Sequence, residues 1–197
     1  MSTVSLLERL AEADAKGQVA YTRYLCEQIL AESPEHGPTL LRYANALIDL
    51  SLYDEAAQAL ETAMNLVPEK HRHLVHAARG HRLDAMGDHV AAIAEHLRGH
   101  DLDPTNAGHL IYAATSARRS GDLTRAESLV RQAIDCVEGC VDEAYYNLGG
   151  CLLAKGAYGE ARDCYQKALE IDPEYELAKK RLEDVELVLA AVRLEEG

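Results

Sequence analysis

Hydrophobic positions near the C-terminal end of the chain recur with the period of two short amphipathic helices. The segment from Asp142 to Tyr175 reads DEAYYNLGGCLLAKGAYGEARDCYQKALEIDPEY. Apolar residues return there every three or four positions on either side of Lys155-Gly156, which predicts two helices joined by a short turn. Asp172-Pro173 ends the second helix, because proline disfavours a helical conformation in the residue before it.

Small residues lie where the two predicted helices would touch: Gly149 on the first helix, and Ala161 and Ala168 on the second. Together with the large residues between them, they resemble the tetratricopeptide repeat (TPR), a 34-residue helix-turn-helix unit. The positions that carry the resemblance are Tyr145, Leu148, Gly149, Leu152, Ala161, Tyr165, Ala168 and Pro173. Tyrosine stands where the family often has tryptophan.

The same pattern recurs toward the N-terminus at intervals of about one repeat. We expect repeats over residues 3–36, 37–72, 73–106, 107–141 and 142–175, followed by a capping helix over residues 176–195. The first repeat is the weakest, since Thr22 stands where alanine is expected, and the fourth has Glu138 in place of the closing proline. The resemblance implies an all-α fold, a right-handed superhelical solenoid of antiparallel helix pairs with a concave surface.

Ligands of TPR arrays usually lie along the first helix of each repeat, at its second, fifth, sixth, ninth, twelfth and thirteenth positions. The resemblance therefore implies a groove that includes Arg42, Asn45, His81, Tyr112, Thr115, Arg118, Arg119, Tyr146 and Asn147. Tyrosine and arginine are enriched at interface hot spots, and arginine grips carboxylates with two hydrogen bonds. We expect a protein or peptide partner here, and a carboxylate on it would suit the arginines. The alternative is that Arg118 and Arg119 only solubilise a helix end.

One narrower ligand is not indicated. Chaperone-binding members of the family hold an acidic C-terminus with lysines at two of these positions, where this chain has Leu41 and Ile111.

Composition narrows the classes of function. The formal net charge is −13 at pH 7, which argues against nucleic-acid binding, because that depends on lysine and arginine at the phosphates. No apolar run approaches a membrane span, and the N-terminal stretch lacks the apolar segment of a secretory signal. No phosphate-loop, metalloprotease or hydrolase motif occurs. We therefore expect a cytoplasmic, non-enzymatic interaction module without a cofactor, an adaptor or a scaffold that contacts no membrane.

Histidines crowd the middle of the chain and leave three alternatives open. His73 and His76 lie on one face of a predicted helix, and His96 and His100 on one face of the next. If Gly80 meets Ala92 across the pair, the four rings converge. The set His73, His76, His96 and His100 could then bind a transition metal or make the protein a pH-responsive regulator. The third alternative is that these histidines replace ordinary large side chains of the repeat.

Cysteines and the last helix add two further expectations. Five cysteines give no disulfide framework, and we expect Cys136 and Cys140 to be buried, inert thiols. Leu187, Val188 and Leu194 widen the apolar stripe of the C-terminal helix. A homo-oligomeric scaffold that associates through this helix is therefore another alternative.

Overall fold

The computed structural model describes residues 3–136 and 138–195, and in these ranges the chain is helical. The helices are α1 (Thr3–Ala15), α2 (Val19–Glu32), α3 (Gly37–Asp49), α4 (Tyr53–Leu66), the short 3-10 helix η1 (Glu69–His71), α5 (Arg72–Ala85), α6 (His89–Leu102), α7 (Ala107–Arg119), α8 (Leu123–Ile134), α9 (Val141–Ala154), α10 (Tyr158–Ile171) and α11 (Glu176–Glu195). The described residues contain no strand beyond one isolated bridge. The predicted all-α class is confirmed. None of these helices combines the length and apolarity needed to cross a lipid bilayer.

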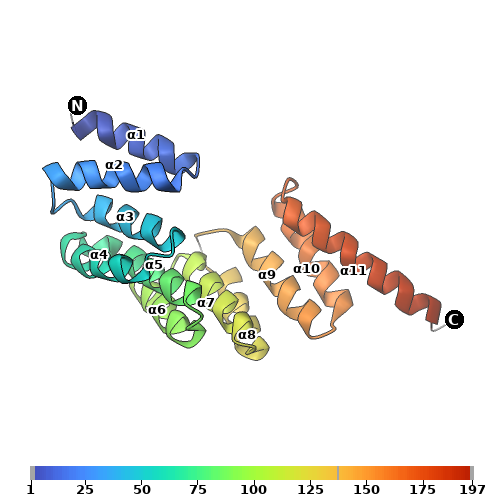
Figure 1. The fold of residues 1–197 in the computed structure, drawn as a ribbon. Coiled ribbons are helices and arrows are strands. Elements are labelled where there is room, and N and C mark those ends of the chain that lie inside the picture. Colours follow the sequence, from blue (N-terminus) through green and yellow to red (C-terminus); the bar gives the residue numbers. More distant parts are fainter. Residues whose placement is uncertain (1–2, 137, 196–197) are drawn as a thin grey trace. The chain divides into compact units, whose positions relative to one another are not determined.

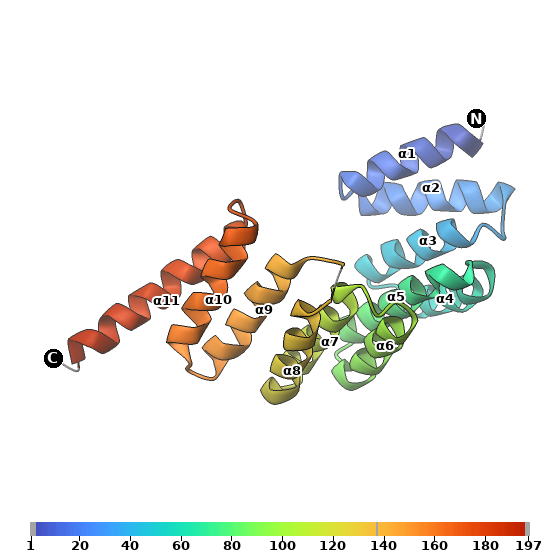
Figure 2. The same cartoon turned by 180° about the vertical axis from the view of Figure 1, so that it is seen from behind.

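The chain divides into two compact units, residues 1–102 and 103–197. In each unit, consecutive helices lie side by side as antiparallel neighbours, α1 to α6 in the first and α7 to α11 in the second (Figures 1 and 2). The buried cores consist mainly of alanine and branched aliphatic side chains, joined by larger or polar residues such as Tyr165 and His96. Amphipathic helices of this length are stabilised mainly by packing one face against a neighbour.

The turn inside every helix pair contains a residue in the left-handed backbone region. This residue is glycine in four pairs and serine in one: Gly17, Ser51, Gly87, Gly121 and Gly156. Glycine adopts this conformation without steric cost, whereas a residue with a Cβ atom does so at a cost of about 1 kcal/mol or more. The turn of the second pair is therefore strained at Ser51, where φ is 60°.

A second feature that recurs in the helix pairs is a buried residue on each helix at corresponding positions. A Cβ atom placed on Gly149 would lie 2.6 Å from Cε1 of Tyr165, so the glycine seats the tyrosine ring. The corresponding residues of the five pairs, given as first helix and second helix, are Leu10 and Cys26, Ala44 and Leu60, Gly80 and His96, Ala114 and Val130, and Gly149 and Tyr165, and all are buried. A smaller residue on one helix accompanies a larger one on the other, as close packing requires.

The fourth pair ends by a different device from the proline that closes other repeats. The Glu138 N–H donates to the Thr105 carbonyl at 2.9 Å, and the Ala107 N–H donates to the Glu138 carbonyl at 2.9 Å. Proline could not make the first of these bonds, because it has no N–H. This backbone exchange explains why the fourth repeat lacks the proline that the family pattern has at this position.

Candidate functional site

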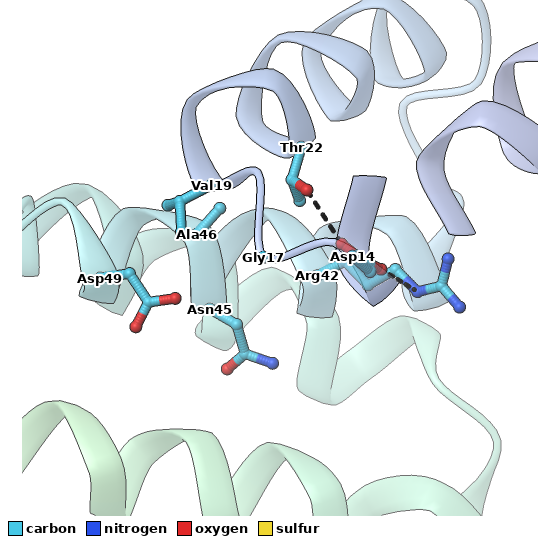
Figure 3. A pocket seen from close by; sticks show the side chains of 8 residues that line it. All are labelled: Asp14, Gly17, Val19, Thr22, Arg42, Asn45, Ala46 and Asp49. Atoms are coloured by element: carbon cyan, nitrogen blue, oxygen red, sulfur yellow. Dashed lines mark hydrogen bonds and ion pairs between the residues drawn. The ribbon is translucent and has the colours of Figure 1, made fainter. Parts of the chain in front are cut away.

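A polar cleft opens between α1, α2 and α3 in the first unit (Figure 3). Its volume is about 200 Å³. It is lined by Asp14, Gly17, Val19, Thr22, Arg42, Asn45, Ala46 and Asp49. Asp14, Arg42, Asn45 and Asp49 occupy groove positions of the first two repeats, and Asn45 and Asp49 project from the same side of α3.

Charges inside this cleft are partly paired. The Arg42 Nε atom lies 3.5 Å from Oδ2 of Asp14. The Thr22 hydroxyl donates to the other oxygen of Asp14 at 3.0 Å, so the carboxylate is fixed in place. Arg42 and Asp14 both remain substantially exposed, and an exposed ion pair of this kind contributes little to stability. Both groups thus stay accessible to a polar ligand.

Groove positions of the second unit carry tyrosines and arginines. Tyr112 on α7 is 40% exposed, and Arg118 and Arg119 are exposed in the last turn of the same helix, with Thr115 half-buried before them. On α9, the Tyr146 ring lies 5.1 Å from the Tyr175 ring and 5.9 Å from the Tyr165 ring, measured between centroids. The structure thus places predicted groove residues of this unit at least partly on its surface.

Asn147 has less freedom than its groove position suggests. Its side-chain amide donates to the Glu143 carbonyl within α9 at 2.9 Å. This bond uses one of the two donor hydrogens of the amide. The half-buried Asn147 therefore offers a partner the rest of its amide.

The predicted register of the histidines is wrong by one turn. Gly80 seats the His96 ring, since a Cβ on Gly80 would lie 2.4 Å from its Cε1 atom, and does not meet Ala92 as expected. His96 is fully buried, and its Nε2 atom lies 3.7 Å from Oδ2 of Asp84. It occupies the place that Tyr165 fills in the fifth pair. The half-buried His81, a predicted groove residue, lies beside it with ring centroids 5.3 Å apart.

The other histidines of the predicted metal set have different neighbours. His76 Nδ1 pairs with Oε2 of Glu95 at 2.8 Å, and His73 and His100 are half-buried elsewhere on their helices. Among the described residues 3–102, no three His, Cys, Asp or Glu side chains bring ligand atoms within 4.8 Å of one another. The expected convergence does not occur, and metal binding or pH sensing by these residues stays a prediction.

Cysteine placement also departs from the expectation. Cys140 is exposed and Cys136 is half-buried, so they are not the buried thiols that the sequence led us to expect. Cys26, Cys151 and Cys164 are buried. Burial raises the pKa of Cys26 to about 12 and raises the pKa of Cys151, which keeps both as unreactive thiols near neutral pH.

The C-terminal helix packs on α10 with one narrow stripe. Ala178 and Val185 are buried, whereas Leu187 and Leu194 are 72% and 84% exposed and Val188 is half-buried. The predicted self-association residues thus lie largely outside the contact with α10. Association through them stays a prediction.

Comparison with known families identifies the architecture. Models of the tetratricopeptide repeat match residues 15–80 and residues 142–175, which together are just over half of the chain. The chain belongs to the tetratricopeptide repeat family.

Similar proteins are TPR proteins too. Small glutamine-rich tetratricopeptide repeat-containing protein 2 of Mycosarcoma maydis is 30% identical over 105 residues, 53% of this chain and 30% of that protein. The chain thus spans about a third of that relative's length. A thermophilic TPR protein of Thermus thermophilus has a TM-score of 0.73 and 20% identity, over 94% of this chain and 100% of that chain. The first TPR of Spaghetti (RPAP3) bound to the HSP90 peptide SRMEEVD has a TM-score of 0.56 and 26% identity, over 61% and 95%. The predicted TPR solenoid fold is confirmed.

Three residues of the TPR groove faces were missed at the sequence level. Asp14 stands at the twelfth position of its repeat and Glu143 at the second position of its own. Both are groove positions of the family, so the position rule could have found both residues. Tyr175 precedes α11, outside any first helix, and no sequence signal marks it. Members of the TPR family are in general interaction modules without catalytic activity, and the described residues give this chain faces suited to that role.

Proposed function

We propose that the chain is an adaptor or scaffold that binds a peptide segment of a partner protein along the first helices of its repeats. The observation that carries the proposal is the cleft between α1, α2 and α3, where Asp14, Arg42, Asn45 and Asp49 present both signs of charge around a volume of about 200 Å³. A cleft of this size takes side chains and backbone of a peptide and is too small to enclose a drug-sized ligand.

The chemistry of the cleft fits a polar peptide. The Arg42 guanidinium can donate two hydrogen bonds to a carboxylate, and the Asn45 amide can pair with a peptide backbone group. The preference for a carboxylate rests on Arg42 here and on Arg118 and Arg119 in the second unit. A similar TPR structure holds a peptide with acidic residues, which supports a peptide as the type of ligand.

Affinity capture from the native cells tests the proposal. The bait proteins are the wild type, the groove variant Arg42→Ala/Asn45→Ala, and the control variant Gln58→Ala/Asn65→Ala, which changes two exposed residues of α4. We expect the wild type and the control to retain the same partner and the groove variant to lose most of it. A partner that binds all three baits equally contradicts the proposed groove.

A further inference from the structure

An acidic group sits among tyrosines on one face of the second unit. Tyr146 on α9 and Tyr175 before α11 hold their rings 5.1 Å apart at 44°. Tyr112 on α7, a helix that packs against α9, is 40% exposed. Glu143 lies one turn before Tyr146 on α9, so the two side chains share a face of the helix.

The Glu143 carboxylate acts electrostatically on two of these tyrosines. Its charge contributes to raising the pKa of Tyr112 and the pKa of Tyr175, for each of which burial is the larger cause. A charge acts in this way only on groups close to it. Together with the shared face of α9, the contact between the Tyr146 and Tyr175 rings and the packing of α7 on α9, this influence groups Tyr112, Glu143, Tyr146 and Tyr175 in one partly buried patch. We refer to these four residues as the tyrosine–glutamate patch.

Glu143 lacks a cationic neighbour within the described part of the chain. Burial raises its pKa and the charge of Asp142 raises it further, with no cation acting in the opposite direction. Arg181 on α11 reaches the patch at another point, where it interacts with the Tyr146 hydroxyl, and it lies 3.5 Å from Oδ2 of Asp184; it is not among the groups that act on Glu143. A partly desolvated carboxylate without a counter-charge is unfavourable, and a cation bound beside it would remove that cost.

We propose that the tyrosine–glutamate patch binds a lysine or arginine side chain of the partner protein. Tyrosine rings attract a cation that lies within about 6 Å of the ring centroid, and the carboxylate of Glu143 supplies a charge-assisted hydrogen bond. A carboxylate ligand would be repelled at this place. The inference rests on the proposed function and adds a basic anchor to it, distinct from the carboxylate that the arginines would hold.

The test uses small cations, so that no partner need be known. The full chain is titrated with Nα-acetyl-lysine amide and Nα-acetyl-arginine amide, whose side chains keep their charge, while the tyrosine resonances are followed by NMR. Nα-acetyl-norleucine amide serves as the uncharged control. We expect saturable shifts with one or both cations and none with norleucine. Glu143→Gln and Tyr112→Leu should each weaken binding by about ten-fold. Glu170→Gln, which removes the same charge from an exposed site on α10, should leave it unchanged.

The pH dependence separates a direct contact from a general charge effect. Because the pKa of Glu143 is raised, cation binding should strengthen as pH rises through the range above the ordinary glutamate value of 4.5, and Glu143→Gln should abolish this dependence. Equal binding of the cations and norleucine, or equal affinity of the wild type and Glu143→Gln, overturns the inference.

Failure of the inference can be told apart from failure of the proposed function. If neither cation binds while the Arg42→Ala/Asn45→Ala bait still loses its partner, the peptide groove is supported and the binding of a lysine or arginine at the patch is refuted. If the cations bind with the expected pH dependence while all three baits capture the same amount of partner, the tyrosine–glutamate patch is supported and the cleft in the first unit is refuted as the binding site.

Discussion

Replacing Gly149 by alanine should destabilise the fifth repeat. The new Cβ would lie 2.6 to 2.9 Å from three atoms of the Tyr165 ring, whereas carbon atoms in contact prefer about 3.5 to 4.0 Å. Tyr165 is only 1% exposed, so its ring has no free space to enter. Overpacking of this kind typically costs about 1–3 kcal/mol. Alanine returns about 1 kcal/mol through its higher helix propensity, which leaves a net loss of about 1 kcal/mol.

The next residue provides a matched control. A Cβ on Gly150 meets nothing within 4 Å, so Gly150→Ala should gain the same propensity of about 1 kcal/mol without a clash. The difference between the two variants is then the cost of the contact with Tyr165 alone, about 2 kcal/mol. For a chain of this length it corresponds to a difference of about 4–8 °C in melting temperature.

Far-UV circular dichroism during heating and urea unfolding measures the difference. Repeat arrays can unfold in parts, so hydrogen exchange of α9 and α10 amides should accompany it as a local measure. The double variant Gly149→Ala/Tyr165→Leu recreates the combination of Ala44 and Leu60 in the second repeat, and there the alanine should no longer destabilise. Equal stability of Gly149→Ala and Gly150→Ala, or an unchanged penalty when Gly149→Ala is made in the Tyr165→Leu background, would refute the packing argument.

Three further changes test other parts of the structure. Ser51→Gly should stabilise by about 0.5–1 kcal/mol because it relieves a positive φ, and an unchanged or lower urea midpoint contradicts this. Glu95→Gln should destabilise the protein by about 1 kcal/mol near neutral pH. The hydrogen bond with His76 lowers the pKa of Glu95, so the stabilisation that this carboxylate gives is complete above the ordinary glutamate pKa of 4.5 and is lost as the pH falls below it. A gap between wild type and variant that stays constant down to pH 3 would exclude this pairing. Association through α11 predicts that light scattering gives a mass above the monomer value of 21.6 kDa, and that Leu187→Glu/Leu194→Glu restores that value; a monomeric wild type excludes it.

The frame of the molecule was predictable because its signal is local and repeated. Apolar periodicity, turn residues such as Gly156, and Pro173 act within one repeat, and they predict helix pairs without knowledge of the partner helix. The contact of His96 with Gly80 was not predictable in this way. Which residue of the second helix meets Gly80 depends on the register between two helices, and a one-turn difference moves the contact from Ala92 to His96.

The chemistry of the faces was only partly predictable for a similar reason. Position within the repeat indicated Arg42 and Tyr146, but it gave no information about which charge lies beside them. Arg42 has Asp14 at 3.5 Å, contributed by the preceding repeat. Tyr146 has Tyr175, contributed by the segment before α11. In both cases the neighbour lies outside the helix that carries the groove residue, so position within that helix could not show the contact.

The residues that pack the helices and the residues on the groove faces are largely different, which explains how one repeat fold can present two kinds of binding surface. In the buried pairs a smaller residue on one helix accompanies a larger residue on the other, as Ala44 with Leu60 and Gly149 with Tyr165 show. The packing between the two helices of a repeat is therefore set by these pairs and not by the residues on its face. The face of the first unit then combines a guanidinium with carboxylates, and that of the second combines a carboxylate with tyrosine rings. Because Arg42 and Glu143 belong to none of these buried pairs, Arg42→Ala and Glu143→Gln should change binding without changing the melting temperature by more than about 1–2 °C.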